Sequence, residues 1–378
     1  MDCSHVFEFK FRRLIVVFTL FSAFLMVSLG AKAQVDTAHK AEETHAETSE
    51  KKKFEIGKFA LHHIADSHSW HVIGETYVGL PVILYANGKV VTFNASDFHH
   101  DDDAKVVVEK GGERFVKMHE KIYLASATAN EHGQYVELDE KHHAKNARPL
   151  DFSLTKNTCT LLLSVVLLLV VFISVANGYK KRHGKSPKGL QSWLEPIILF
   201  VRDDIAKPNL GHKHERFMPY LLTVFFFIWF NNMLGLVPFL PGGANLTGNI
   251  AVTMVLAVTT FLITIFNGNK HYWKHIFWMP GVPVPMKIFL MPLELIGIFT
   301  KPIALMIRLF ANITAGHILV LSLICLIFVF NSIWVSAASI PFAIFIGGIE
   351  LMVAFIQAFI FTILSALFIG MAVEEHHH

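Results

Sequence analysis

The sequence predicts an all-α membrane protein with several spanning helices, a pair of long tilted helices at its C-terminal end, and a small extracytoplasmic β-hairpin unit near its N-terminus. Hydrophobic residues fill 53% of the 378 positions, charged residues fill 17%, and the mean hydropathy is +0.46. This composition is too apolar for a soluble globular chain of the same length. Three widely spaced cysteines indicate neither a disulfide framework nor a thiolate metal site. The net charge of +3 is small, and no basic cluster interleaved with aromatic residues indicates nucleic acid as a partner.

Residues 1–33 are typical of an export signal peptide. Basic residues precede an apolar run from Leu14 to Leu29, and small residues end the segment at Ala33. We expect cleavage after Ala33, and an uncleaved membrane anchor is the alternative. In either case the polar region that follows, as far as about residue 155, is predicted to be exported.

Residues 34–70 are charged and low in hydrophobic residues, which predicts a polar linker that is partly disordered. Residues 71–150 predict the β-hairpin unit. Asn87-Gly88 separates two runs of β-forming residues, which is a strong hairpin signal, and Gly111-Gly112 separates a weaker pair. The flanking runs are Pro81–Tyr85 and Lys89–Phe93 for the first hairpin, and Val106–Val108 and Arg114–Val116 for the second.

Histidines are frequent in this exported region, and neutral imidazoles beside carboxylates are possible ligands for zinc or another divalent ion. No pair of them has a tight ligand spacing on a defined element, and exposed histidines often only bind water. We therefore expect no metal and no cofactor on this chain. The residues in question are His62, His63, His68, His71, His99, His100 and Asp101–Asp103.

The membrane region is predicted to begin with a span over Thr158–Asn177, which is 20 residues without a charge. Lys180-Lys181-Arg182 follows directly and is predicted to be cytoplasmic by the positive-inside rule. Residues Leu190 to Ala206 mix large apolar side chains with charges, so we expect a helix that lies along the membrane surface.

Further spans are predicted at Phe217–Leu240 and at Ile250–Phe266, with His271–His275 on the cytoplasmic side. Met286–Val373 is then apolar for longer than two upright spans require. Two long, strongly tilted helices would use the excess, with a reversal near Asn331–Ser339. This topology leaves the C-terminus in the cytoplasm.

Arg308 lies inside this apolar tract. A guanidinium stays charged at physiological pH, and placing one at mid-membrane costs about 2.5–3.5 kcal/mol on insertion scales. One interpretation is a structural arginine that pairs with a carboxylate or reaches a lipid headgroup. The other is a functional charge, because proteins seldom keep such a residue in the membrane without a use.

Four charged residues of the tract recur every seven positions, namely Lys287, Glu294, Lys301 and Arg308. Seven residues on an α-helix drift by only about 20°, so these side chains are predicted to form one stripe, which Asn312 extends by a turn. Such a stripe should face another protein or water rather than lipid. For the two lysines alone, a simple reach to the headgroups is the favoured interpretation.

Three further polar residues interrupt the last apolar segments. His317 is about half a helical turn out of phase with Arg308, and Glu350 and Gln357 share one face of the following helix. An imidazole, a carboxylate and an amide within apolar sequence are suited to a proton path. A buried His–Glu pair that only locks two helices together is the alternative.

These motifs, in this order and spacing, resemble subunit a of the F-type ATP synthase from about residue 155 to the end. The residues that carry the resemblance are Asn231-Asn232-Met233-Leu234-Gly235-Leu236-Val237-Pro238, Asn245, Asn249, Pro292-Leu293-Glu294, Lys301-Pro302, Arg308-Leu309-Phe310-Ala311-Asn312, Ala315-Gly316-His317, Gln357-Ala358-Phe359-Ile360-Phe361 and Met371-Ala372-Val373-Glu374-Glu375-His376.

The resemblance implies a stator subunit of the membrane F0 sector, in a bacterial inner membrane, without a catalytic or nucleotide site of its own. Its partners would be the ring of c subunits, the peripheral stalk subunit b, the other F0F1 subunits and the lipid bilayer. Arg308 matches the essential arginine that faces the ring carboxylates, and Glu294 matches a carboxylate on the cytoplasmic side. Proton-channel positions are matched by Asn312, His317, Glu350 and Gln357.

The chain departs from a common form of this family by carrying His317 where an acid is often found and Glu350 where a histidine is often found. The exchange keeps one imidazole and one carboxylate, which predicts a working relay. The family pattern says nothing of the exported β unit, which would brace the complex, pack, or bind a metal weakly.

Two other classes of protein fit the sequence less well. A divalent-metal transporter fed by the histidine-rich segment should show several intramembrane ligands in metal spacing, and the sequence shows none. An intramembrane hydrolase should show a His-Glu-x-x-His or a Gly-x-Ser-x-Gly pattern, and neither is present.

Overall fold

The computed structural model describes residues 66–73, 76–99, 101–139, 144–182, 185–237, 243–279, 281–330 and 332–374. The predicted signal peptide and most of the predicted linker lie outside these residues. The chain divides into two compact units. Leu61–Leu162 with Leu234–Ala244 forms a mainly β unit that includes the start of the first long helix, and Leu163–Met233 with Asn245–His378 forms a helical unit.

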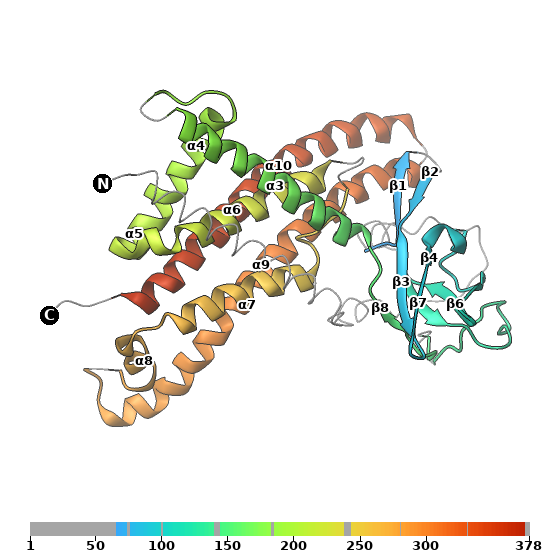
Figure 1. The fold of residues 1–378 in the computed structure, drawn as a ribbon, viewed down its shortest axis with the longest axis horizontal. Coiled ribbons are helices and arrows are strands. Elements are labelled where there is room, and N and C mark those ends of the chain that lie inside the picture. Colours follow the sequence, from blue (N-terminus) through green and yellow to red (C-terminus); the bar gives the residue numbers. More distant parts are fainter. Residues whose placement is uncertain are drawn as a thin grey trace. The chain divides into compact units, whose positions relative to one another are not determined.

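The β unit contains short antiparallel strands in three small sheets (Figure 1). Both predicted hairpins are present. In the first, Asn87 and Gly88 have φ values of 48° and 80°, and positive φ at both positions is what a two-residue type I′ turn requires. The strands are β1 (Ser69–Ile73) paired with β2 (Thr76–Gly79), then β4 (Lys89–Asn94), β3 (Pro81–Ala86) and β8 (Leu150–Asp151) in that order, and then β5 (Val108–Lys110), β6 (Glu113–Met118) and β7 (Lys121–Leu124).

The two three-stranded sheets share one apolar core. Val82 and Leu84 of β3 are fully buried against Phe115 of β6, and Phe98 closes the core from the 3₁₀ turn Ala95–Phe98. Alternate residues along β3 point into this core, as the period of two along a strand requires. The sequence predicted the hairpins but missed β1, β2, β7 and β8, whose runs are short and carry no turn signal as strong as Asn-Gly.

The β unit is tied to the start of α3 (Lys156–Lys181) by hydrogen bonds to the first turn of that helix. The Asn157 N–H donates to the Asp66 side chain at 3.0 Å, and the Lys156 N–H donates to the Ser67 carbonyl at 2.9 Å. The first N–H groups of a helix have no partner within the helix, so these two acceptors satisfy them. Burial raises the pKa of Asp66, although the hydrogen bond from Asn157 opposes the shift.

A group of charged side chains, some of them buried, lies in the same unit. Lys117, only 5% exposed, lies 3.6 Å from Asp102 and 3.5 Å from Glu120. Nearby, the buried His68 ring lies 3.1 Å from Asp151. Burial would raise the pKa of Asp151, but the hydrogen bond to His68 and those from Ser153 outweigh it, so the pKa is lowered. We call His68, Asp102, Lys117, Glu120 and Asp151 the charged cluster.

The helical unit contains the remainder of α3 and the helices α4 to α10, which are labelled in Figure 1. By length and composition, four helical stretches of the described chain are able to cross a membrane, and a fifth is possible if the bent pair α7–α8 counts as one span. The elements are α4 (Leu190–Phe200), a π-helical turn (Val201–Ala206), α5 (Lys207–Leu210), a 3₁₀ turn (Gly211–Lys213), α6 (His214–Leu236), α7 (Ile250–Phe266), α8 (Lys270–Phe277), α9 (Val284–Phe330) and α10 (Ile333–Val373).

The helices occur where the apolar runs predict them. The third predicted span coincides with α7, and the chain bends by 102° between α7 and α8. The segment predicted to lie along the membrane surface is helical, and its Asp203 contacts Arg202 at 2.9 Å and Lys207 at 2.6 Å. Such exposed pairs suit a helix with one wet side.

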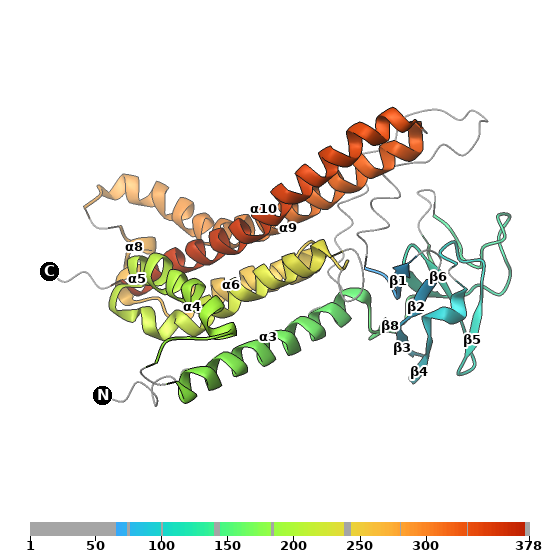
Figure 2. The same cartoon turned by 90° about the horizontal axis from the view of Figure 1, so that it is seen from above.

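The last two helices are the longest and run antiparallel, side by side (Figure 2). At about 1.5 Å per residue, the 47 residues of α9 extend about 70 Å, more than twice the roughly 30 Å hydrocarbon core of a bilayer. The chain reverses between Phe330 and Ile333, at the start of the range that the sequence predicted.

The C-terminal end of α10 is held by donors from two other parts of the helical unit. Lys213 donates to the Val373 carbonyl at 2.9 Å. Asn269 donates its backbone N–H to Ala372 and its side chain to Val373, both at 2.9 Å. These bonds satisfy carbonyls that a helix end leaves unpaired. We call this arrangement the α10 clamp.

Candidate functional site

Two polar contacts join α9 to α10 within otherwise apolar helices. The Asn312 amide donates to the Gln357 side-chain oxygen at 2.9 Å, and His317 Nδ1 lies 3.4 Å from Glu350 Oε1. Because the two helices are antiparallel, these residues form two successive rungs between them. The structure therefore brings together four of the six site residues that the sequence predicted.

Glu350 is only 7% exposed, and its Oε1 atom is buried without a hydrogen bond within the described part of the chain. The contact with His317 has the distance of an ion pair but lacks hydrogen-bond geometry. Gly316 lies against the carboxylate: a Cβ added there would be 3.0 Å from Oε1. A glycine at 316 thus makes room for the carboxylate that the exchange of acid and histidine puts on α10.

A third polar contact reaches α10 from α6, between the two rungs. Asn232, 3% exposed, donates to the Ala354 carbonyl at 3.2 Å and accepts a hydrogen bond from Thr247. The Asn231-Asn232 pair is part of the family resemblance, but its residue types alone predicted no role for it. Two asparagines in an apolar helix were the available signal, since buried amides need partners.

These contacts place polar groups at successive levels of the helical unit. We call this set the polar seam, and its members are Asn232, Thr247, Asn312, His317, Glu350 and Gln357. Among the described residues, Gln357 Nε2 of the seam is also buried without a hydrogen bond. The same is true of Oδ1 of the neighbouring Asn231. Buried polar atoms without protein partners are sites where water or an exchanging proton is held.

Arg308 is on a different face of α9 from the residues that pack inward. Leu305, Leu309 and Ile313 are buried, whereas Arg308 is exposed. No ion pair of Arg308 occurs within the described residues. Asn312 follows one turn later on α9, so the guanidinium emerges beside the seam rather than inside it.

The other members of the predicted stripe do not share the exposure of Arg308. The Lys287 and Lys301 ammonium groups lie over the rings of Trp278 and Phe368, at 4.6 and 5.6 Å from the ring centres. Such cation–π contacts offset part of the cost of placing an amine among apolar groups. Glu294 is half-buried, 14 residues before Arg308, or about 21 Å along the helix axis. The structure does not bring Glu294 to the seam.

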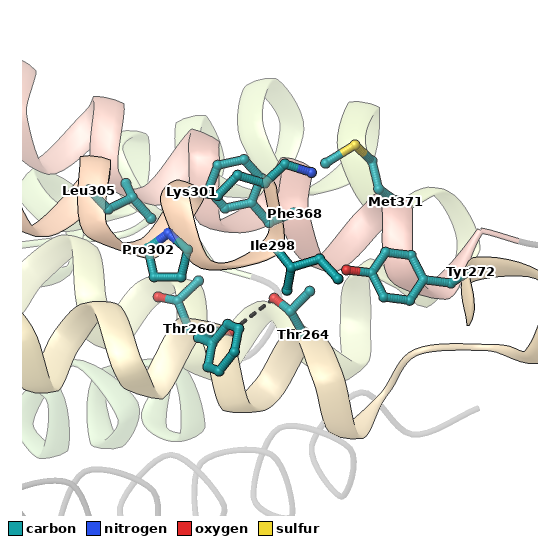
Figure 3. A pocket seen from close by; sticks show the side chains of 10 residues that line it. Thr260, Thr264, Tyr272, Ile298, Lys301, Pro302, Leu305, Phe368 and Met371 are labelled. Carbon is teal, nitrogen blue, oxygen red and sulfur yellow. Dashed lines mark hydrogen bonds between the residues drawn. The ribbon is translucent and has the colours of Figure 1, made fainter. Parts of the chain in front are cut away.

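A small, mostly apolar pocket lies on α9 between the levels of Glu294 and Arg308 (Figure 3). Four helices contribute to it, and its few polar groups include Lys301, Tyr272 and Thr264, which donates to the Thr260 carbonyl. The pocket does not contain any seam residue.

The histidine-rich region gives no support to a metal site in the residues that the structure describes. No group of three histidine, cysteine or acidic side chains is placed to hold a metal ion there. His68 instead contacts Asp151. His62, His63 and His100 lie outside the described residues.

Long apolar helices crossed by a partly buried polar seam, with an exposed arginine beside it, define a multi-spanning membrane protein able to conduct a small ion. The chain belongs to the ATP synthase A chain family, whose family model matches residues 158–370. The match includes every member of the seam and Arg308.

Several curated relatives are similar over the same region. The chain is 42% identical over 317 residues to ATP synthase subunit a of Pelodictyon phaeoclathratiforme, an alignment that covers 79% of this chain and 92% of that protein. It is 47% identical over 234 residues to ATP synthase subunit a of Chloroherpeton thalassium, covering 60% and 69%. It is 49% identical over 229 residues to ATP synthase subunit a 2 of Chlorobaculum tepidum, covering 59% and 64%.

The β unit has a match of its own. Residues 59–152 fit the model of a domain of unknown function, DUF8433. This range includes β1 to β8 and ends before α3 begins.

Proposed function

We propose that the polar seam is part of one of two half-channels through which protons reach and leave a rotating ring of c subunits, and that Arg308 separates the two. The protein is a proton-translocating membrane subunit of the F0 stator, not the catalytic part of the synthase. The observation that carries the proposal is the placement of an exposed, unpaired arginine beside buried polar contacts on the same helix.

The charge of Arg308 needs a partner from outside the chain. A guanidinium is permanently charged, and the described residues offer it no carboxylate. A ring carboxylate that passes within about 4–6 Å would supply one, and the arginine would lower the pKa of that carboxyl by about 1–3 units. The ring carboxylate would therefore be ionised opposite Arg308 and would take up a proton only where the seam delivers it.

His317 and Glu350 are suited to deliver that proton. The carboxylate is buried, has a free acceptor atom, and lies beside an imidazole, a side chain that can both accept and donate a proton. A proton or a water held between them would pass to either group without leaving the seam. Asn312, Gln357, Asn232 and Thr247 extend the path with groups that hold water but carry no charge.

Glu294 would serve the second half-channel. It lies toward the start of α9, about 21 Å along the helix axis from Arg308 and on the opposite side of it from His317. With Lys180-Lys181-Arg182 in the cytoplasm, the start of α9 is also cytoplasmic, and the C-terminus with it. The N-terminal β unit is then extracytoplasmic, after removal of the signal peptide, in the inner membrane of a bacterium.

The test is ATP-driven acidification of inverted membrane vesicles that carry equal amounts of assembled enzyme. We expect Arg308→Ala to abolish acidification while assembly is retained. Arg202→Ala is the matched control: it removes an exposed arginine whose partner Asp203 keeps Lys207. Undiminished acidification by the Arg308 variant would reduce this residue to a structural role.

A further inference from the structure

One face of the β4-β3-β8 sheet is apolar although it is not covered by the rest of the β unit. Val82, Leu84 and Ala86 of β3 point into the core, so the residues between them point outward. Tyr85, 42% exposed, is opposite Val90 on β4 and Leu150 on β8, which are 67% and 48% exposed.

Phe152 continues the same face. Its N–H donates to the Ile83 carbonyl at 2.9 Å, and its side chain is 58% exposed. Tyr85, Val90, Leu150 and Phe152 thus form a continuous exposed patch, which we call the apolar face. A patch of neighbouring large apolar side chains exposed on one face of a sheet is typical of an interaction surface.

The apolar face is fixed close to the point where the chain enters the membrane. Phe152 precedes the first residue of α3 by four positions, which span at most about 13 Å of extended chain. The Leu154 N–H donates to the Pro81 carbonyl, so β3 remains bonded to this segment almost to the helix. The Asp66 and Ser67 contacts described above also join the unit to the first turn of α3. The face therefore cannot move far from the headgroup layer.

We propose that the apolar face rests on the lipid bilayer, with its side chains among the headgroups at the side where α3 begins. Continuity favours lipid as the partner, because Leu162 in the second turn of α3 is itself 40% exposed and would meet the acyl chains. The composition of the face agrees: tyrosine and phenylalanine beside aliphatic residues are typical of surfaces at the membrane interface. The β unit would then lie on the membrane surface beside the start of α3.

The experiment uses the complete synthase, purified and reconstituted into vesicles of phosphatidylethanolamine and phosphatidylglycerol. The native cysteines are replaced by alanine, and single cysteines are introduced for an environment-sensitive fluorophore. Val90→Cys reports on the apolar face, and Thr92→Cys reports on the same face without loss of an apolar side chain. Glu131→Cys is the control, on an exposed turn of the same unit.

A headgroup spin-labelled lipid and aqueous iodide are used as separate quenchers. We expect the labels at 90 and 92 to be quenched several-fold more by the spin-labelled lipid than the label at 131, and less by iodide. Equal quenching of all three by iodide would place the face in water and overturn the proposal. Protection of 90 and 92 from both quenchers would overturn it too, since a protein subunit would then cover the face. Acidification by each labelled enzyme checks that it is assembled, which keeps this result separate from the role of Arg308.

Discussion

The polar seam and the charged cluster both contain buried polar atoms, and His68 Nδ1 of the cluster also lacks a hydrogen bond among the described residues, but the two groups pair their charges differently. In the cluster, Lys117 has two carboxylates within 3.6 Å and His68 has Asp151. In the seam, Glu350 Oε1 and Gln357 Nε2 are buried without a hydrogen bond. A paired set of charges fixes geometry, whereas a set with open positions can exchange a proton or hold water. This difference agrees with a structural role for the charged cluster and with the proposed proton-conducting role for the polar seam.

Lys117→Met should have the largest effect, because it leaves Asp102 and Glu120 buried without their cation. Breaking a buried pair from one side costs about 3–5 kcal/mol. We expect the β unit to become sensitive to protease in the intact complex. Lys105→Met is the control. It removes the cation of the exposed Lys105–Asp103 ion pair and should change protease resistance little. Equal resistance of the two variants would show that the cluster does not hold the unit together.

Glu350→Gln tests the seam, and it should impair proton transport without impairing the structure. The amide keeps the shape but cannot carry a proton, so acidification should fall by at least about tenfold while assembly and protease resistance stay unchanged. Glu374→Gln, at the exposed end of the same helix, is the matched control. A variant that lost assembly instead would support the alternative of a pair that only locks the two helices.

Asp151→Asn should weaken the β unit in a manner that depends on pH. The fold lowers the pKa of Asp151, so its ionised form is the stabilised one. Its contribution is fully present above the ordinary value of about 3.9 and is lost as the pH falls through the lowered pKa. Protease resistance of the variant should therefore be lower than normal at pH 7 and approach that of the unchanged protein near pH 3. Asp103→Asn, at an exposed position, should show no such convergence.

Gly316→Ala should have the smallest of these effects. The added methyl group would press on Glu350 Oε1 at 3.0 Å and displace the carboxylate from His317. We expect acidification to fall several-fold. Gly297→Ala, on the same helix with no neighbour within 4 Å, should pump normally. If both alanine variants pumped equally, the carboxylate would have room to move and its position would not limit the relay.

Local patterns predicted much of the fold. Asn87-Gly88 predicted the first hairpin correctly, because few residues accept positive φ. The uncharged run Ile250–Phe266 predicted the bounds of α7. The short strands β1 and β8 are held by pairing to distant residues, so no local pattern signals them.

The site was predictable in its members but not in its connections. Period and residue type singled out Arg308, His317 and Glu350, yet the approach of Asn232 to Ala354 depends on the packing of α6 against α10. The prediction of a charged stripe did not include the aromatic rings that Lys287 and Lys301 contact through cation–π interactions. The proposed partner of Arg308 is outside the chain, so this sequence alone could not place it.

The α10 clamp has a mechanical consequence. If Arg308 faces the rotating ring as proposed, any sideways force that the ring exerts on it is carried along α9 and the antiparallel α10 packed beside it. Because Lys213 and Asn269 fasten the last carbonyls of α10, this pair behaves as a beam anchored at one end rather than one with a fraying tip. A stiff helix pair bends little under load, so the stator would transmit torque with little elastic deformation.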